Sequence, residues 1–134
     1  MTKEQIINAL KETAKPYDSY YIEDEVRQAM MQLPEPFELV EPILEIIGAN
    51  PTVDFGMPGD LVHYVERFSE KGYEELLIAS VKKNPTAHNI WMVHRCYNDV
   101  ENSLRKEFKS LITELKTDSS VSQEIKKVID EFSW

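Results

Sequence analysis

The sequence predicts an all-α protein of about eight helices in antiparallel pairs, forming either a HEAT-like α-solenoid or a compact irregular bundle. Three observations indicate this fold class. Apolar residues recur at intervals of three and four along the chain, proline and glycine separate these segments, and alternating strand patterns are nearly absent. Because short amphipathic helices cannot bury both faces alone, we expect the pairs to stack on one another.

The first two helices are marked by their boundaries. The first follows Thr2, which forms a capping-box pattern with Gln5, and Pro16 ends it. The second follows Asp18 or Ser19 and runs to the next proline pair. Its apolar residues keep helical spacing throughout.

The third segment and the loop after it hold the breaks of the first half. Residues 37–47 continue a helical stripe that Pro42 interrupts. Because proline removes a donor and clashes with the preceding turn, we expect a kink or a restart there. Residues 52–59 form the longest loop, in which Gly56 and Gly59 can adopt positive φ. The Val-Asp-Phe-Gly segment of this loop is the only plausible extended piece.

The second half should contain five helices separated by glycine and Asn-Pro breaks. Their expected starts are, in order, Pro58, Tyr73, Thr86, Asp99 and Ser120, the last forming a capping box with Gln123. The residues expected to be buried on the core-facing stripes are Leu61, Val62, Val65, Leu76, Leu77, Ile90, Trp91, Phe108, Leu111, Ile125 and Val128.

A short phrase occurs twice in the middle of the chain. The residues 50–52, Asn-Pro-Thr, return as residues 84–86, and residues 62–63, Val-His, return as residues 93–94. The offsets are 34 and 31 residues, so the two copies differ by three residues in length. A period in this range is typical of stacked helix pairs.

The chain of 134 residues is expected to be one domain, and its charge is uneven. Residues 1–57 carry eleven acidic and four basic side chains, a net charge of −7, whereas residues 58–134 contribute −2 to the total of −9. An acidic half of this kind repels nucleic acid and anionic membranes and attracts a basic protein. Solubility alone is the simpler interpretation.

Targeting and catalytic signals are missing from the sequence. No apolar run is long enough for a membrane span, the N-terminus does not resemble a secretory signal, and the lone Cys96 is typical of the cytoplasm. His63 and Glu66 lie one helical turn apart, but no second Glu-x-x-His motif completes a metal site. We therefore expect a non-enzyme that holds neither metal nor cofactor, with a structural or interface role for this pair.

Two further groups are candidates for contacts. The tyrosines at 17, 20 and 21 stand beside Glu23, Asp24 and Glu25, a composition enriched at protein interfaces and equally typical of a half-buried helix start. Glu66 is expected to pair with Arg95, and Arg95 with Asn98 could tie their helix to the 54–59 loop.

One pattern resembles a known class of proteins. It reads N-P-x-x-D-F-G-x-P-G-x-L-V-H-x-x-E over residues 50–66, G-Y-x-x-L-L-x-x-S over 72–80, N-P-T over 84–86 and W-M-x-x-R-x-x-N over 91–98. This order is similar to small helical bacterial immunity-type proteins encoded beside polymorphic or contact-dependent toxins. The chain departs from that pattern at Asp60, where a second proline is frequent, and at residues 93–95, where Leu-Asn-Arg is frequent.

The resemblance implies a binding protein that neutralises a cognate toxin domain by masking its active site. The acidic first half would suit a basic toxin such as a nuclease. The alternatives are a helical-repeat scaffold module and, less favoured, a ligand-binding domain or enzyme that uses the 54–59 loop with His63 and Glu66. The expected partner-binding residues are Tyr20, Tyr21, Glu23, Asp24, Glu25, Glu35, Glu38, Glu41, Asp54, Asp60, His63 and Glu66.

Overall fold

The computed structural model describes all 134 residues and contains eight α-helices, one short 3₁₀ helix and no strand. The helices are α1 (Lys3–Thr13), α2 (Asp24–Met31), η1 (Pro36–Leu39), α3 (Val40–Ala49), α4 (Asp60–Glu66), α5 (Tyr73–Lys83), α6 (Ala87–Asn98), α7 (Arg105–Thr117) and α8 (Gln123–Asp130). The predicted all-α fold is confirmed. No helix is long and apolar enough to cross a lipid bilayer.

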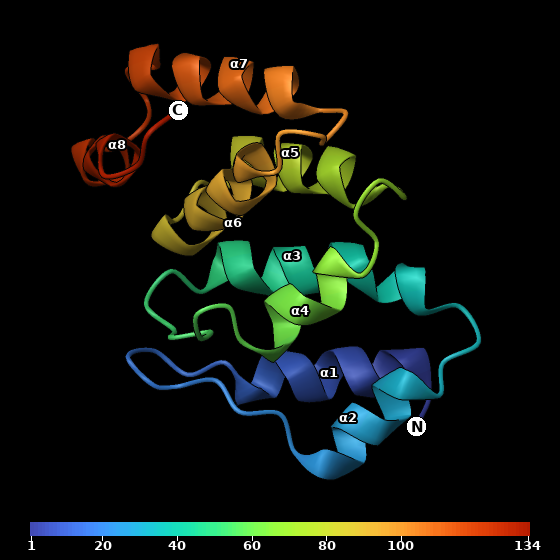
Figure 1. Cartoon of the computed structure of the whole chain (residues 1–134). Coiled ribbons are helices and arrows are strands. Elements are labelled where there is room, and N and C mark those ends of the chain that lie inside the picture. The colour runs from blue at the N-terminus through green and yellow to red at the C-terminus, as the bar shows by residue number, and fades with distance from the viewer.

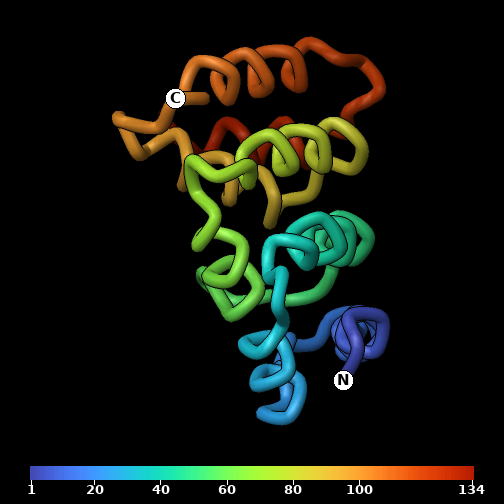
Figure 2. The backbone as a smooth tube through the Cα atoms, turned by 90° about the vertical axis from the view of Figure 1, so that its right-hand side faces the viewer, coloured from blue at the N-terminus to red at the C-terminus, as the bar shows by residue number.

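Consecutive helices pair, and the four pairs stack along one axis (Figure 1). α1 contacts α3, α3 contacts α5, and α5 contacts α7, so one helix of each pair continues the stack. Figure 2 shows the same order from the side, with the two chain termini at opposite ends. This arrangement is solenoid-like, because each pair buries its apolar face mainly against its neighbours in the stack.

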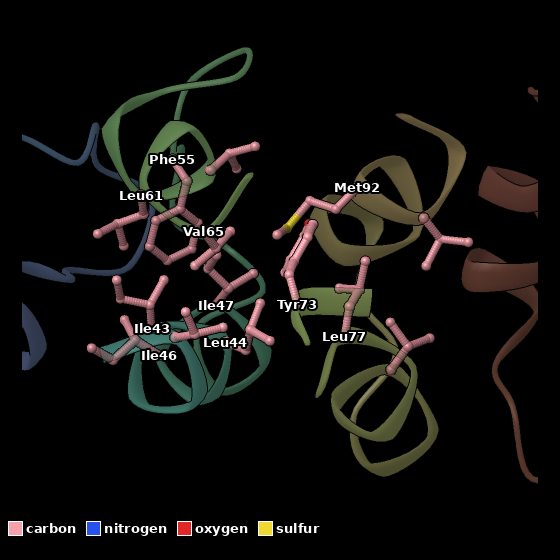
Figure 3. Packing of buried hydrophobic residues seen from close by; sticks show 14 of the residues in the cluster. Ile43, Leu44, Ile46, Ile47, Phe55, Leu61, Val65, Tyr73, Leu77 and Met92 are labelled. Atoms are coloured by element: carbon pink, nitrogen blue, oxygen red, sulfur yellow. The ribbon is translucent and has the colours of Figure 1, made fainter. Parts of the chain in front are cut away.

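The core is centred on α3, which lies in the middle of the stack and packs against α1, α4 and α5. Its buried side chains are Val40, Ile43, Leu44, Ile46 and Ile47. Figure 3 shows this face next to Leu61 and Val65 of α4, with Tyr73 and Leu77 of α5 nearby. A single cluster of 29 buried apolar residues thereby joins all four pairs.

The predicted helix starts at Thr2, Tyr73 and Thr86 are confirmed, and those at Asp99 and Ser120 are wrong. Thr2 with Gln5, and Thr86 with Asn89, form complete capping boxes. Asp99 does not cap α7, because a turn over residues 99–104 separates them and its carboxylate accepts the amide of Glu101 instead. The last helix starts at Gln123, with Ser122 rather than Ser120 at its N-cap.

The second helix begins later than expected, at Asp24, because residues 17–20 pair with another loop instead of coiling. Pro42 does not interrupt its helix. It is the third residue of α3, within the first turn, where a missing amide donor costs nothing. The restart lies upstream, where η1 passes directly into α3 at Val40.

Seven of the eleven side chains expected in the core are buried, and four are half-buried. The half-buried ones are Leu76, Trp91, Ile125 and Val128. Ile125 and Val128 belong to α8 in the terminal pair, which has a neighbouring pair on one side only. Trp91 packs under Arg95, whose guanidinium lies 5.1 Å from the ring centroid.

The repeated phrase coincides with equivalent helix ends. Asn50 is the C-cap of α3 and Asn84 is the C-cap of α5, with similar backbone angles (φ −129°, ψ 67° and φ −146°, ψ 83°). Val62 and Val93 are both buried, one in each following helix. The copies differ where Thr86 caps α6 directly, whereas the 52–59 loop separates Thr52 from α4. The recurrence therefore marks two successive helix pairs.

Candidate partner-binding surface

Two loops far apart in the sequence are joined by backbone hydrogen bonds. The amide of Tyr20 donates to the carbonyl of Asp54 at 2.8 Å, and the amide of Asp54 donates to the carbonyl of Asp18 at 2.9 Å. These bonds make a parallel bridge between Ser19 and Asp54, so the Val-Asp-Phe-Gly segment does contain the extended piece that was expected. The 14–23 and 51–59 loops lie on the same side of the stack (Figure 1). Asp54 is thereby brought beside the tyrosine-rich segment.

The 54–59 turn holds its shape through two glycines. Gly56 and Gly59 have φ of +97° and +83°, as predicted for this loop. A Cβ atom on Gly59 would lie 1.7 Å from the carbonyl oxygen of Phe55, which no side chain could tolerate. The amide of Gly56 donates to Asp54 Oδ1 at 3.0 Å and fixes that carboxylate at the start of the turn.

Apolar side chains project from both loops. Tyr17 is 88% exposed, Tyr21 65% and Met57 82%, and they are among the few large apolar side chains of the chain left in solvent. Tyr17 also has a φ of 61°, a left-handed conformation that is uncommon for a residue with a side chain. Exposed aromatic and methionine side chains are enriched at interfaces. We name Tyr17, Tyr21, Asp54 and Met57 the loop surface.

Tyr20 is half-buried, so the loop surface does not include it, and its expected role as a binding anchor stays a prediction. Its hydroxyl donates to the carbonyl of Leu10 at 2.7 Å, and its ring packs 5.1 Å from that of Phe55. Burial raises the pKa of Tyr20 well above its ordinary value. Tyr20 therefore fastens the 14–23 loop to α1 and to the 51–59 loop.

Three carboxylates of the expected site lie next to this surface. Glu23, Asp24 and Glu25 are exposed at the start of α2, and Glu23 occupies the N-cap position without bonding the helix through its side chain. Negative charge at a helix N-terminus is favourable in itself, so these residues also stabilise α2. Asp60 lies across from α2 and pairs with Arg27 at 3.0 Å.

The remaining expected residues lie elsewhere. Glu35, Glu38 and Glu41 are exposed beyond the other end of α2, and Glu38 forms an ion pair with Lys3 at 3.1 Å. His63 is exposed on α4. Glu66 is held by Arg95 through two hydrogen bonds, at 2.7 and 2.9 Å, so the expected ion pair is present. Arg95 is therefore not tied to the 54–59 loop, and Asn98 contacts His94 instead.

A run of rings connects the loops to α6. Phe55 packs 5.4 Å from His88, and His88 packs 5.4 Å from Trp91. The Nε2 atom of His88 is buried without a hydrogen-bond partner. Burial lowers the pKa of His88, and the carboxylate of Asp54 partly opposes that change. The loops are thus anchored on the neighbouring helix pair through apolar and aromatic contacts.

The side chains that could ligate a metal are scattered, and the single cysteine, Cys96, is buried. No group of three or more His, Cys, Asp or Glu side chains lies close enough together to hold a metal ion. Burial, with the nearby carboxylates of Glu74 and Glu66, raises the pKa of the Cys96 thiol to about 12. A thiol with such a pKa is a poor nucleophile at neutral pH.

Comparison with protein families, with curated proteins and with solved structures finds no match to this chain. The functional assignment therefore depends on the surface itself. Sequence reasoning missed two of its members, Tyr17 as an exposed anchor and Met57. The sequence places Tyr17 in the acidic tyrosine cluster but does not show which tyrosines are exposed. The structure shows that Tyr20 points inward, whereas Tyr17 and Tyr21 are exposed to solvent.

Proposed function

We propose that this chain is an immunity-type binding protein that neutralises a cognate protein toxin domain. The loop surface with the neighbouring carboxylates of Glu23, Asp24 and Glu25 would contact the toxin. The observation that carries the proposal is the combination of exposed Tyr17, Tyr21 and Met57 with these carboxylates on the most acidic part of the chain. The resemblance over residues 50–66, 72–80, 84–86 and 91–98 supports the toxin as the partner.

The chemistry of this surface favours a basic partner. Long-range attraction between opposite net charges speeds encounter, and a few apolar anchors that lose their water set the dissociation rate. A basic nuclease would present a cationic active site that an acidic protein could cover. In this proposal the chain acts by binding alone and performs no catalysis.

The paired loops suit such a role because they are held rigid. The backbone bridge between Ser19 and Asp54, the hydroxyl bond of Tyr20 and the closed turn at Gly59 fix the loops before any partner arrives. A binding surface that is ordered in advance loses less entropy on association. The same features would also serve a helical-repeat scaffold, which differs only in its partner.

The test is co-expression with the variable C-terminal domain of a toxin gene found beside this one. We expect this chain to restore growth of cells that express the toxin domain and to co-purify with it in a defined ratio. Reversing Glu23, Asp24 and Glu25 to lysine should weaken both effects. Failure of the intact chain to protect or to co-purify would contradict the immunity function.

A further inference from the structure

A groove separates α2 from α4 on a part of the chain that the proposed function does not use. It has a volume of about 420 Å³. Its apolar lining consists of Ile22, Met30 and Tyr64, which are buried, and Met31, which is 73% exposed. Methionine is flexible and polarisable, so such a lining adapts to apolar side chains of several shapes.

The charge of the groove is opposite to that of the chain. Two arginines, Arg27 and Arg67, and His63 line it, against the single carboxylate of Asp60. Arg27 and Asp60 form an ion pair at 3.0 Å and neutralise each other. Arg67 is therefore left as the uncompensated cation of the groove.

Arg67 is exposed and stacks on two aromatic rings. Its guanidinium lies 5.0 Å from the ring centroid of Tyr64 and 5.5 Å from that of Phe68. No carboxylate lies within 4.0 Å of it, and it makes no hydrogen bond. Stacking on aromatic faces restrains the planar guanidinium while its N–H groups stay free for a two-pronged bond to a carboxylate.

We propose that this groove binds an acidic–apolar peptide segment of a protein partner. One apolar side chain of the segment packs between Met30, Met31 and Tyr64, and an Asp or Glu carboxylate of the segment bonds to Arg67. The chain has a net charge of −9, but the groove carries the unpaired cation of Arg67. The groove therefore selects an acidic rather than a basic segment. This proposal does not rest on the immunity function, which requires a basic surface on the partner.

The test uses the full chain labelled with ¹³C at the methionine methyl groups. The probe is a short acetylated and amidated peptide in which leucine alternates with glutamate, so that every carboxylate comes from a side chain. We expect the methyl signals of Met30 and Met31 to shift on titration. Met57 on the loop surface and the buried Met92 report binding elsewhere and should stay unchanged.

Three comparisons make the test decisive. A peptide with lysine in place of glutamate, and one with glycine in place of leucine, should both bind at least about tenfold more weakly. Arg67→Glu should weaken binding of the leucine–glutamate peptide by at least the same factor, whereas Lys71→Glu, an exposed change of equal charge outside the groove, should alter it by less than about threefold.

The proposal is overturned by several results. These are an absence of binding, equal binding of the lysine peptide, a shift of Met57 in place of Met30 and Met31, or an unchanged affinity in Arg67→Glu. A neutral peptide with a free C-terminal carboxylate serves as a further probe. Should it alone bind, the groove recognises chain ends and the proposed side-chain recognition is wrong.

Discussion

The carboxylate of Glu66 accepts two hydrogen bonds from the guanidinium of Arg95 and so fastens α4 to α6 across neighbouring helix pairs. The two side chains are 24% and 34% exposed, which removes much of the competing water. Their hydrogen bond raises the pKa of Arg95, and the same guanidinium covers the ring of Trp91. This ion pair thereby joins two neighbouring helix pairs of the stack, and its arginine covers the ring of Trp91.

Breaking this contact should destabilise the fold. Glu66→Gln and Arg95→Lys should each lower the free energy of unfolding by about 1–2 kcal/mol, because a two-pronged, partly buried pair is worth more than an exposed one. In a double-mutant cycle measured by chemical denaturation, the two changes should couple by about 1 kcal/mol. Strict additivity would show that the pair contributes no energy to the stack.

Gly59 and Gly48 should respond in opposite ways to alanine. At Gly59 a Cβ would collide with the Phe55 carbonyl at a φ of +83°, so Gly59→Ala should cost at least about 2 kcal/mol. At Gly48, inside α3, the nearest atom to a Cβ would be Asn84 Cβ at 3.5 Å, an ordinary contact. Gly48→Ala should therefore be neutral or stabilise by up to about 1 kcal/mol. Thermal unfolding of both variants checks this, and equal effects would contradict the closed turn.

His88 should make stability depend on pH. Burial lowers its pKa below the ordinary 6.5, so protons bind the unfolded chain more readily than the folded one. The folding stability that depends on a neutral His88 is fully present above pH 6.5 and is lost as the pH falls below the lowered pKa of His88. The carboxylate of Asp54 reduces this loss because it favours the protonated imidazole. His88→Phe, which keeps a ring between Phe55 and Trp91, should lose less stability than the wild type between about pH 7.5 and about pH 5.5.

A matched control for that measurement is His63→Gln, because His63 is exposed on α4. It should follow the pH profile of the wild type. If His88→Phe and the wild type instead run parallel over the whole range, His88 is protonated equally well in the folded and unfolded chain, and its burial among the rings has no effect on titration.

The tyrosines at 20 and 21 should separate stability from binding. Tyr20→Phe removes the hydroxyl bond to the Leu10 carbonyl and should cost about 1 kcal/mol of folding free energy. Tyr21→Ala, at a 65% exposed position, should change stability by less than about 0.5 kcal/mol. With a toxin partner, Tyr21→Ala should mainly speed dissociation. If Tyr20→Phe keeps its stability but binds the toxin partner more weakly, Tyr20 belongs to the interface.

The sequence rules for helix caps and turns predicted the features that depend on residues close together in the chain. The capping box at Thr2, the N-cap at Thr86 and the positive φ of Gly59 follow from residue types at a helix start or in a turn. The Glu66–Arg95 pair was expected as a contact between the two helices that carry the repeated phrase. The starts proposed at Asp99 and Ser120 were wrong because several residues there can cap a helix and only tertiary packing selects one.

Several contacts between segments far apart in the sequence were not predicted. The bridge between Ser19 and Asp54 is made of backbone groups, which every residue carries, so no pattern of side chains predicts it. It delays α2 and turns Tyr20 inward, and the exposure of Tyr17 is a consequence of that pairing. Trp91 has helix spacing typical of the core but lies at a half-buried position under Arg95. The groove between α2 and α4 depends on how the two helices pack.

We propose that a basic protein partner meets the acidic surface around the paired loops. The test compares two triple charge reversals with the same change in net charge. One replaces Glu23, Asp24 and Glu25 by lysine, beside the loop surface. The other, the control, replaces Glu107, Glu114 and Glu124, which are exposed on α7 and α8 at the far end of the stack. Circular dichroism first confirms that both variants fold.

The measurement is the rate constant of association with the neighbouring toxin domain, at about 50 mM and about 200 mM salt. Reversal at Glu23, Asp24 and Glu25 should slow association by at least about tenfold at low salt, and the difference from the wild type should shrink at the higher salt. The control reversal should slow it by less than about threefold. Equal association rates for the wild type and the Glu23–Asp24–Glu25 variant at low salt would show that the partner does not meet this acidic surface.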